Sequence, residues 1–124
     1  MRELKFRCYS IPYARMYTPI TSRIIVESEN NFNDNIKIMQ YTGLKDKNGV
    51  LIFEGDICKI NYSLDSQKNS YCEHGIVLIE YHEGSYWAVN KEDKYHVIID
   101  KQEVLEVIGN IYENPYLLKY KAKG

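Results

Sequence analysis

The stretch of residues 41–57 constrains the fold most, because it holds three of the seven glycines and the densest turn chemistry in the chain. Asp46 and Gly49 predict a tight reversal, since an aspartate can hydrogen-bond the backbone two residues on and a glycine can adopt positive φ. Leu44 and Leu51 flank the reversal with strand residues. We therefore expect a β-hairpin with a type I turn and a glycine bulge.

Turn chemistry recurs outside this hairpin. Residues 54–56 (Glu-Gly-Asp) predict a second sharp turn, and Asp56 is expected to hold it through its backbone neighbours. Gly109 interrupts a strand pattern and predicts a bulge or a close approach of another segment. The residues expected to hold turns are Gly43, Asp46, Gly49, Gly55, Asp56 and Gly109.

Most of the remaining chain has the period of two that is typical of β-strands. Phe6 and Cys8 alternate with Lys5 and Arg7, which predicts a half-buried strand. Pro12 predicts a turn, because proline cannot donate to a central ladder. We expect an edge strand at residues 13–17, further strands at 24–26, 36–41, 57–62, 75–82, 86–90, 95–99 and 106–112, and polar loops at 28–35 and 63–73.

Two short helical segments complete the pattern. Asp100 and Glu103 have the spacing of a capping box, which predicts one or two helical turns. Asn114 and Pro115 form a helix start, because asparagine caps free amides and proline suits the first helical position. We expect an all-β protein that ends in a short helix at residues 116–121.

Composition bounds the class of protein. The net charge of −1 gives no whole-chain attraction to nucleic acid or anionic membrane, and the 12 tyrosines favour strands and contact surfaces. Cys8, Cys58 and Cys72 are odd in number and lack a paired motif, which argues against disulfides and for a reducing compartment. No apolar run has the length of a signal peptide or membrane span, so we expect a cytoplasmic protein without membrane contact.

Four segments carry a family resemblance. They are residues 1–7 (MRELKFR), 39–49 (MQYTGLKDKNG), 54–57 (EGDI) and 107–115 (VIGNIYENP). In this order they resemble the YopX family of phage and prophage proteins. The resemblance implies an SH3-like barrel core, a family of undefined molecular role, and no catalytic residues to carry over. On this basis we expect an N-terminal strand layer and polar loop at residues 1–35, packed on an SH3-like barrel core with the short helix at 36–124.

A metal site is a weak hypothesis. Cys72, Glu73 and His74, with His82, offer zinc-ligating atoms, but zinc requires four ligands at fixed distances and no second cysteine pair exists. The simpler interpretation is an unpaired thiol with surface imidazoles. We expect no metal and no cofactor.

Catalysis has no clear signature either. Cys58 or Cys72 could pair with His82 or His96 as a nucleophile, although Cys58 lies in an apolar strand where cysteine behaves as a small hydrophobe. Carboxylate pairs act in hydrolysis only in a cleft that shifts their pKa values. The pairs considered are Glu54 with Asp56 and Glu80 with Glu83. We expect a protein that is not an enzyme.

Nucleic-acid binding has a local candidate. Cations interleaved with aromatic rings can bind phosphates and stack on bases. The N-terminal segment offers Arg2, Lys5, Arg7, Arg15 and Arg23 near Tyr9, Tyr13 and Tyr17. The preferred interpretation is a solvated strand face on a hairpin.

The expected strands at 75–82, 86–90 and 95–99 carry apolar residues at both parities, whereas a barrel interior takes only one face of a strand. If Val77, Ile79, Trp87, Val89, Val97 and Ile99 face the core, the other face carries Ile76, Leu78, Tyr86 and Ile98. These four residues are the candidate interface, covered by the N-terminal layer or by a partner subunit. We expect a homo-oligomer.

The function predicted is that of a non-enzymatic phage accessory protein that acts by binding. Its expected partners are further copies of itself and a phage or host protein. One alternative is a nucleic-acid-binding module, which salt-dependent retention on DNA or RNA would favour. A second is a hydrolase with an unrecognised site, which a deep pocket joining a histidine or cysteine to carboxylates would favour.

Overall fold

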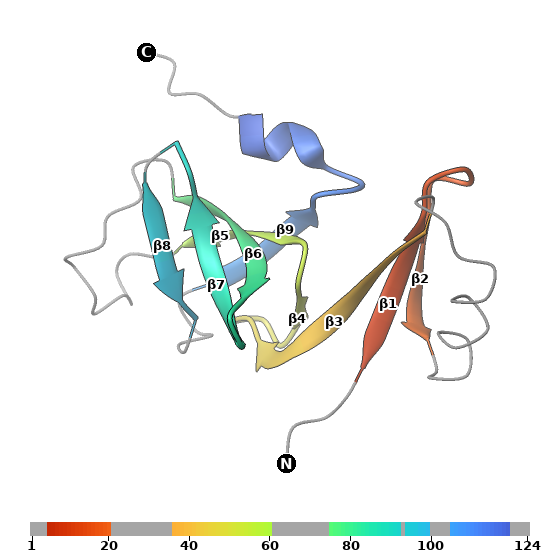
Figure 1. The fold of residues 1–124 in the computed structure, drawn as a ribbon, viewed down its shortest axis with the longest axis horizontal. Coiled ribbons are helices and arrows are strands. Elements are labelled where there is room, and N and C mark those ends of the chain that lie inside the picture. Colours follow the sequence, from red (N-terminus) through yellow and green to blue (C-terminus); the bar gives the residue numbers. More distant parts are fainter. Residues whose placement is uncertain (1–4, 21–35, 61–74, 93, 100–104, 120–124) are drawn as a thin grey trace.

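A computed structural model describes residues 5–20, 36–60, 75–92, 94–99 and 105–119 (Figure 1). The expected strand at 24–26, the capping box at 100–103, and the candidate ligands Cys72, Glu73 and His74 lie outside the described residues. The described strands are β1 (Phe6–Ser10), β2 (Arg15–Ile20), β3 (Ile36–Lys45), β4 (Leu51–Phe53), β5 (Asp56–Ile60), β6 (Ile76–His82), β7 (Ser85–Asn90), β8 (Tyr95–Ile98) and β9 (Leu105–Asn110). The all-β prediction is confirmed.

The C-terminal helix differs from the prediction in type and bounds. It is a 3-10 helix, η3 (Pro115–Lys119), and the described residues contain no α-helix. Asn114 starts it as expected, but its carbonyl oxygen accepts from the Leu117 amide at 3.0 Å, the i to i+3 bond of a tight turn. A segment of five residues is too short to repay the cost of nucleating an α-helix.

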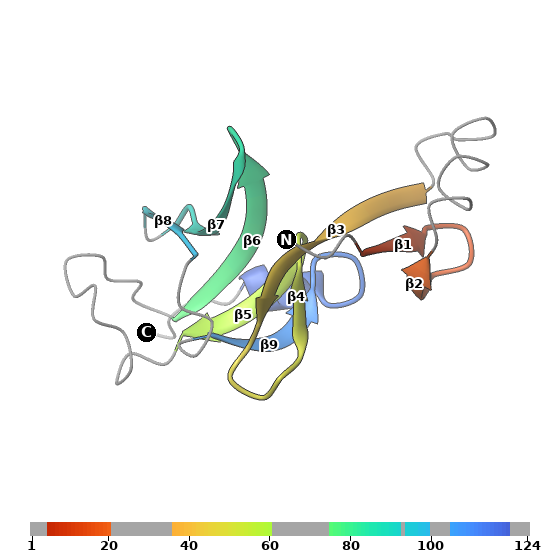
Figure 2. The same ribbon diagram turned by 90° about the horizontal axis from the view of Figure 1, so that it is seen from below.

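The strands form two antiparallel sheets, in the orders β2-β1-β3-β4 and β8-β7-β6-β5-β9. The second sheet curls strongly into a half-barrel, and its curvature is seen best in the strand β6 (Figure 2). The hairpin of β3 and β4 lies at the junction of the two sheets (Figures 1 and 2).

The long strand β3 belongs to both parts of the first sheet. Its first half pairs with β1, from Ser10 opposite Ile36 to Phe6 opposite Gln40, and its second half pairs with β4. We expected residues 1–35 to pack as a layer on the barrel. Instead β1 and β2 continue the sheet sideways from β3 and stand clear of the β6–β8 meander (Figure 2).

The core fills the concave side of the half-barrel. It consists of Ile52, Cys58, Ile60, Val77, Ile79, Tyr86, Ala88, Tyr95 and Leu105. Val97 and Ile99 pack against this cluster, as expected of them.

The facing of β7 differs from the expectation. Val77 and Ile79 point inward, and Ile79 lies opposite Ala88 in the ladder. Residues directly opposite in an antiparallel pair share a face, so Ala88 and, two residues earlier, Tyr86 also point inward. Trp87 and Val89, which we expected inside, lie on the convex face instead, and Tyr86 leaves the set of candidate interface residues.

Candidate interaction surface

Asp46 organises the corner of the fold. One of its carboxylate oxygens accepts hydrogen bonds from the amides of Asn48 and Val50, at 2.8 and 2.9 Å. The other accepts from the amide of Val107 on β9, at 2.9 Å. The first two bonds fix the reversal, in which Gly49 has a φ of 84°. The third joins the β3–β4 hairpin to the edge of the second sheet.

Asp56 holds its turn and also an ion pair that the sequence did not suggest. One carboxylate oxygen accepts from the Phe53 amide at 2.8 Å, and the other accepts from Nη2 of Arg7 at 2.6 Å. Arg7 is buried, contrary to its expected place on a solvated strand face, and its guanidinium lies 4.6 Å from the centroid of the Phe53 ring. Burial raises the pKa of Asp56, although Arg7 and the Phe53 amide act to lower that pKa. Because 49 residues separate the partners, no local pattern could have indicated the pair.

The remaining turn residues lie at bends or close approaches. Gly43 and Gly55 have φ values of 93° and 89°. A Cβ on Gly109 would lie 2.6 Å from Oδ1 of Asn114, so Gly109 is a point of close approach beside the bulge in the β5–β9 ladder. The role of these three glycines is therefore structural.

The convex face of the β6–β8 meander is the candidate surface, and we call it the outer face. Its register follows from the ladders, in which Leu78 pairs with Val89, Glu80 with Trp87, Trp87 with Ile98 and Val89 with His96. The outer face comprises Ile76, Leu78, Glu80, His82, Trp87, Val89, His96 and Ile98. Three of the four candidate interface residues, Ile76, Leu78 and Ile98, lie on it.

Aromatic and charged groups at one end of the outer face hold one another in place. The rings of Trp87 and His96 lie 4.3 Å apart between centroids, and the His82 ring meets His96 edge-on at 6.0 Å. Trp87 donates its indole N–H to the carbonyl oxygen of His82 at 3.1 Å. Nε2 of His82 lies 2.5 Å from a carboxylate oxygen of Glu80. The indole is thereby fixed on the convex face and only partly covered.

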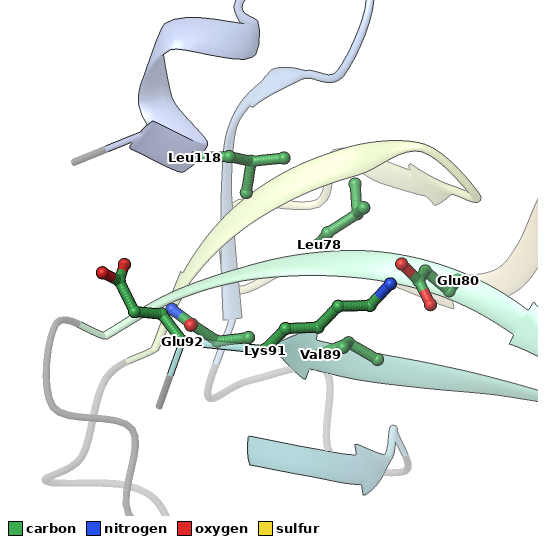
Figure 3. A pocket seen from close by; sticks show the side chains of 7 residues that line it. Leu78, Glu80, Val89, Lys91, Glu92 and Leu118 are labelled. Carbon is green, nitrogen blue, oxygen red and sulfur yellow. The ribbon is translucent and has the colours of Figure 1, made fainter. Parts of the chain in front are cut away.

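A groove runs across the same face. One hollow of about 210 Å³ lies between η3 and the strands β6 and β7 (Figure 3). Leu118 of η3 forms its roof, Leu78 and Val89 form its floor, and Lys91 extends along it toward Glu80 (Figure 3). A second hollow of about 420 Å³ continues toward β8. The two share Glu80, Val89 and Lys91, and we call them together the outer groove; its other lining residues are Leu78, His82, Asn90, Glu92, Lys94, Tyr95, His96 and Leu118.

The expected catalytic partners do not come together in the described part of the chain. Cys58 is fully buried in the core, where burial raises the pKa of its thiol well above the ordinary 9.0. His82 and His96 lie on the opposite, convex side of the sheet. Among the described residues there is also no group of three or more histidine, cysteine or acidic side chains placed to hold a metal ion.

The N-terminal basic cluster is broken up by the fold. Arg7 is paired in the interior, and Tyr9 is buried with its ring stacked on Tyr112 at 5.3 Å. Arg15 remains exposed, with its guanidinium 5.8 Å from the Tyr17 ring. Arg2 and Arg23 lie outside the described residues. Within the described ranges no helix is long and apolar enough to cross a membrane.

Comparison with known proteins agrees with the resemblance seen in the sequence. The crystal structure of protein EF1440 from Enterococcus faecalis is similar, with a TM-score of 0.64 and 26% sequence identity over 95% of this chain and 99% of that chain. The comparison with curated proteins gave no match. The profile of the family described as YopX protein matches residues 4–119. The chain therefore belongs to the YopX family.

Proposed function

We propose that this protein is a non-enzymatic phage accessory protein that acts by binding, built on an SH3-like barrel, and that it self-associates through the outer face. The observation that carries the proposal is the apolar character of this face. Ile98 is 46% exposed beside the partly covered Trp87. The solvent face of an antiparallel sheet is ordinarily polar, so exposed apolar residues grouped there favour a covering partner.

The C-terminal helix accounts for only part of this surface. Leu118 of η3 approaches Leu78 and Val89 at one end of the outer groove (Figure 3). Ile98 lies on β8, which is separated from β6 by β7, so it is on the far side of β7 from Leu78. Tryptophan and tyrosine are frequent anchors of protein interfaces, because they bury large areas with few rotatable bonds. Trp87 is the tryptophan of the outer face.

Both members of one carboxylate pair considered for a hydrolase are engaged in the fold. Asp56 is buried and accepts hydrogen bonds from the Phe53 amide and from Arg7, and Glu54 accepts from the Gln40 amide. A thiol whose pKa is raised is a poor nucleophile, because the thiolate is the reactive form. These observations favour binding over catalysis.

Burial of Arg7 also weakens the nucleic-acid alternative. A phosphate-binding patch requires several exposed cations, and a buried, paired arginine contributes none. Weak or absent binding to nucleic acid at physiological salt stays a prediction.

Light scattering on purified protein tests the proposal. The chain has a mass of 14.6 kDa, and we expect a multiple of this mass at micromolar concentration. Ile98→Lys should shift the mass toward the monomer, because a charge cannot be buried in an apolar contact. Val50→Lys is the matched control, since Val50 is 47% exposed on the β3–β4 hairpin, and it should leave the mass unchanged. A wild-type monomer at high micromolar concentration would refute the proposal.

A further inference from the structure

His96 lies between two other side chains of a cluster on the outer face. Its ring is 4.3 Å from the Trp87 ring between centroids, and the His82 ring meets it edge-on at 6.0 Å. Nε2 of His82 in turn lies 2.5 Å from a carboxylate oxygen of Glu80. The cluster therefore spans β6, β7 and β8, and its two histidines can change charge near neutral pH.

The two histidines differ in what would compensate a positive charge. A protonated His82 forms an ion pair with Glu80, which it already contacts. His96 contacts the rings of Trp87 and His82 instead. The charged and titratable groups that line the second hollow of the outer groove with it are Glu80, His82, Lys91, Lys94 and Tyr95.

These surroundings leave a charge on His96 poorly compensated. Glu80 is the one acid among the described residues that line this hollow, and both His82 and Lys91 are directed toward it (Figure 3). A protonated His96 therefore lies among Lys91, Lys94 and the protonated His82. The face of the Trp87 ring is its nearest compensation, through a cation–π contact.

His96 also lies where a covering partner would remove it from water. It is exposed, it pairs with Val89 in the β7–β8 ladder, and it precedes Ile98 by two residues on the same face of β8. A partner that covers Ile98 would cover His96 as well. A neutral imidazole can be buried at moderate cost, whereas an imidazolium without an acidic partner is far more costly to bury.

We propose that His96 makes self-association through the outer face sensitive to pH, with the neutral imidazole allowing the contact and the protonated imidazole opposing it. This inference rests on the proposed self-association and names its regulation. The associated state binds fewer protons than the free subunits do, so the dissociation constant rises as the pH falls. Histidine side chains exchange their proton between about pH 5 and about pH 8, which sets the range of the response.

Light scattering over a dilution series tests this regulation. The dissociation constant of the wild type should rise about tenfold or more from about pH 8 to about pH 5.5, with unchanged strand content by circular dichroism. His96→Phe keeps an aromatic ring beside Trp87 but cannot take up a proton, so its dissociation constant should be equal at the two pH values. His82→Gln is the matched control. Its amide still donates to Glu80, and it should respond to pH like the wild type.

The fluorescence of Trp87 tests the cluster in the monomer, where self-association plays no part. A protonated imidazole in contact with an indole quenches the emission, because the cation accepts an electron from the excited ring. In the Ile98→Lys variant the emission should therefore lose intensity on acidification. Adding His96→Phe in the same chain should abolish this loss, and adding His82→Gln should leave it in place.

The outcomes separate this inference from the proposal on which it rests. A wild type that is monomeric at both pH values would overturn both. An oligomer whose dissociation constant is equal at the two pH values would overturn the regulation alone. A response to pH that His96→Phe retains would also overturn it, and so would a loss of Trp87 emission that this substitution leaves unchanged.

Discussion

Gly49 and Gly55 have the same backbone conformation but different surroundings. Both have positive φ, whereas a Cβ on Gly49 would meet open space and one on Gly55 would lie 2.9 Å from Sδ of Met39. Gly49→Ala should lower the free energy of unfolding by about 1 kcal/mol, through backbone strain alone. Gly55→Ala should cost about 2 kcal/mol or more, since crowding of Met39 is added. Denaturant titrations of both variants measure this, and equal losses would show that the contact with Met39 adds nothing.

The buried thiol of Cys58 should make stability depend on alkaline pH. Burial raises its pKa in the folded state well above 9.0, and burial raises the pKa of Cys8 in the same direction. In the unfolded chain the thiols ionise near their ordinary pKa, so the unfolded state releases protons first as pH rises. The contribution of these thiols to the free energy of unfolding should therefore be constant below about pH 8 and fall above it.

Cys58→Ala isolates this effect. The variant loses packing at every pH, but its stability should fall less steeply above pH 9.0 than that of the wild type. Urea titrations at several pH values provide the comparison. Parallel curves for the two proteins would assign the alkaline loss to other groups.

The structural role of a single residue could be predicted from the sequence where its hydrogen-bond partners are near in the chain. Asp46 bonds the amides two and four residues on, which is the local pattern that identifies a turn. Arg7 was not predictable, because its charge suits a solvated strand face and its partner Asp56 is remote. The third bond of Asp46, to Val107, was hidden for the same reason.

At the scale of elements, Asp46 couples the β3–β4 hairpin to β9. Asp46→Asn replaces an oxygen acceptor with an amide group, which cannot accept from all three amides at once. We expect a loss of about 1–3 kcal/mol in the free energy of unfolding, as for an unsatisfied buried group. Because the asparagine oxygen can keep both bonds to Asn48 and Val50, hydrogen exchange should accelerate at the Val107 amide. Unchanged protection at Val107 would contradict the coupling.

Strand positions were predicted better than strand faces. The expected strands at 36–41, 75–82, 86–90 and 95–99 correspond to β3, β6, β7 and β8. The predicted facing of β7 was wrong because this strand carries apolar residues at both parities, so its periodicity could not decide which pair faces the interior. The ladder with β6 decides the face, and it is absent from single-strand periodicity.

At the scale of the whole molecule, the hydrophobic pattern indicated that some apolar surface would remain, but its form could not be read from the sequence. The outer groove requires η3 to pack beside β6, and the position of the β1–β2 hairpin requires β1 to join β3 edge to edge. Both are long-range placements. The sequence therefore predicted Ile76, Leu78 and Ile98 as interface residues without indicating the groove.

Trp87 is the only tryptophan of the chain and lies on the middle strand of the outer face, so its fluorescence reports directly on whether that part of the face is covered. If self-association buries the outer face, dilution that dissociates the oligomer should shift the emission of Trp87 to longer wavelength. Ile98→Lys should show the shifted emission at every concentration. An emission maximum that stays constant while the mass falls to 14.6 kDa would contradict the account.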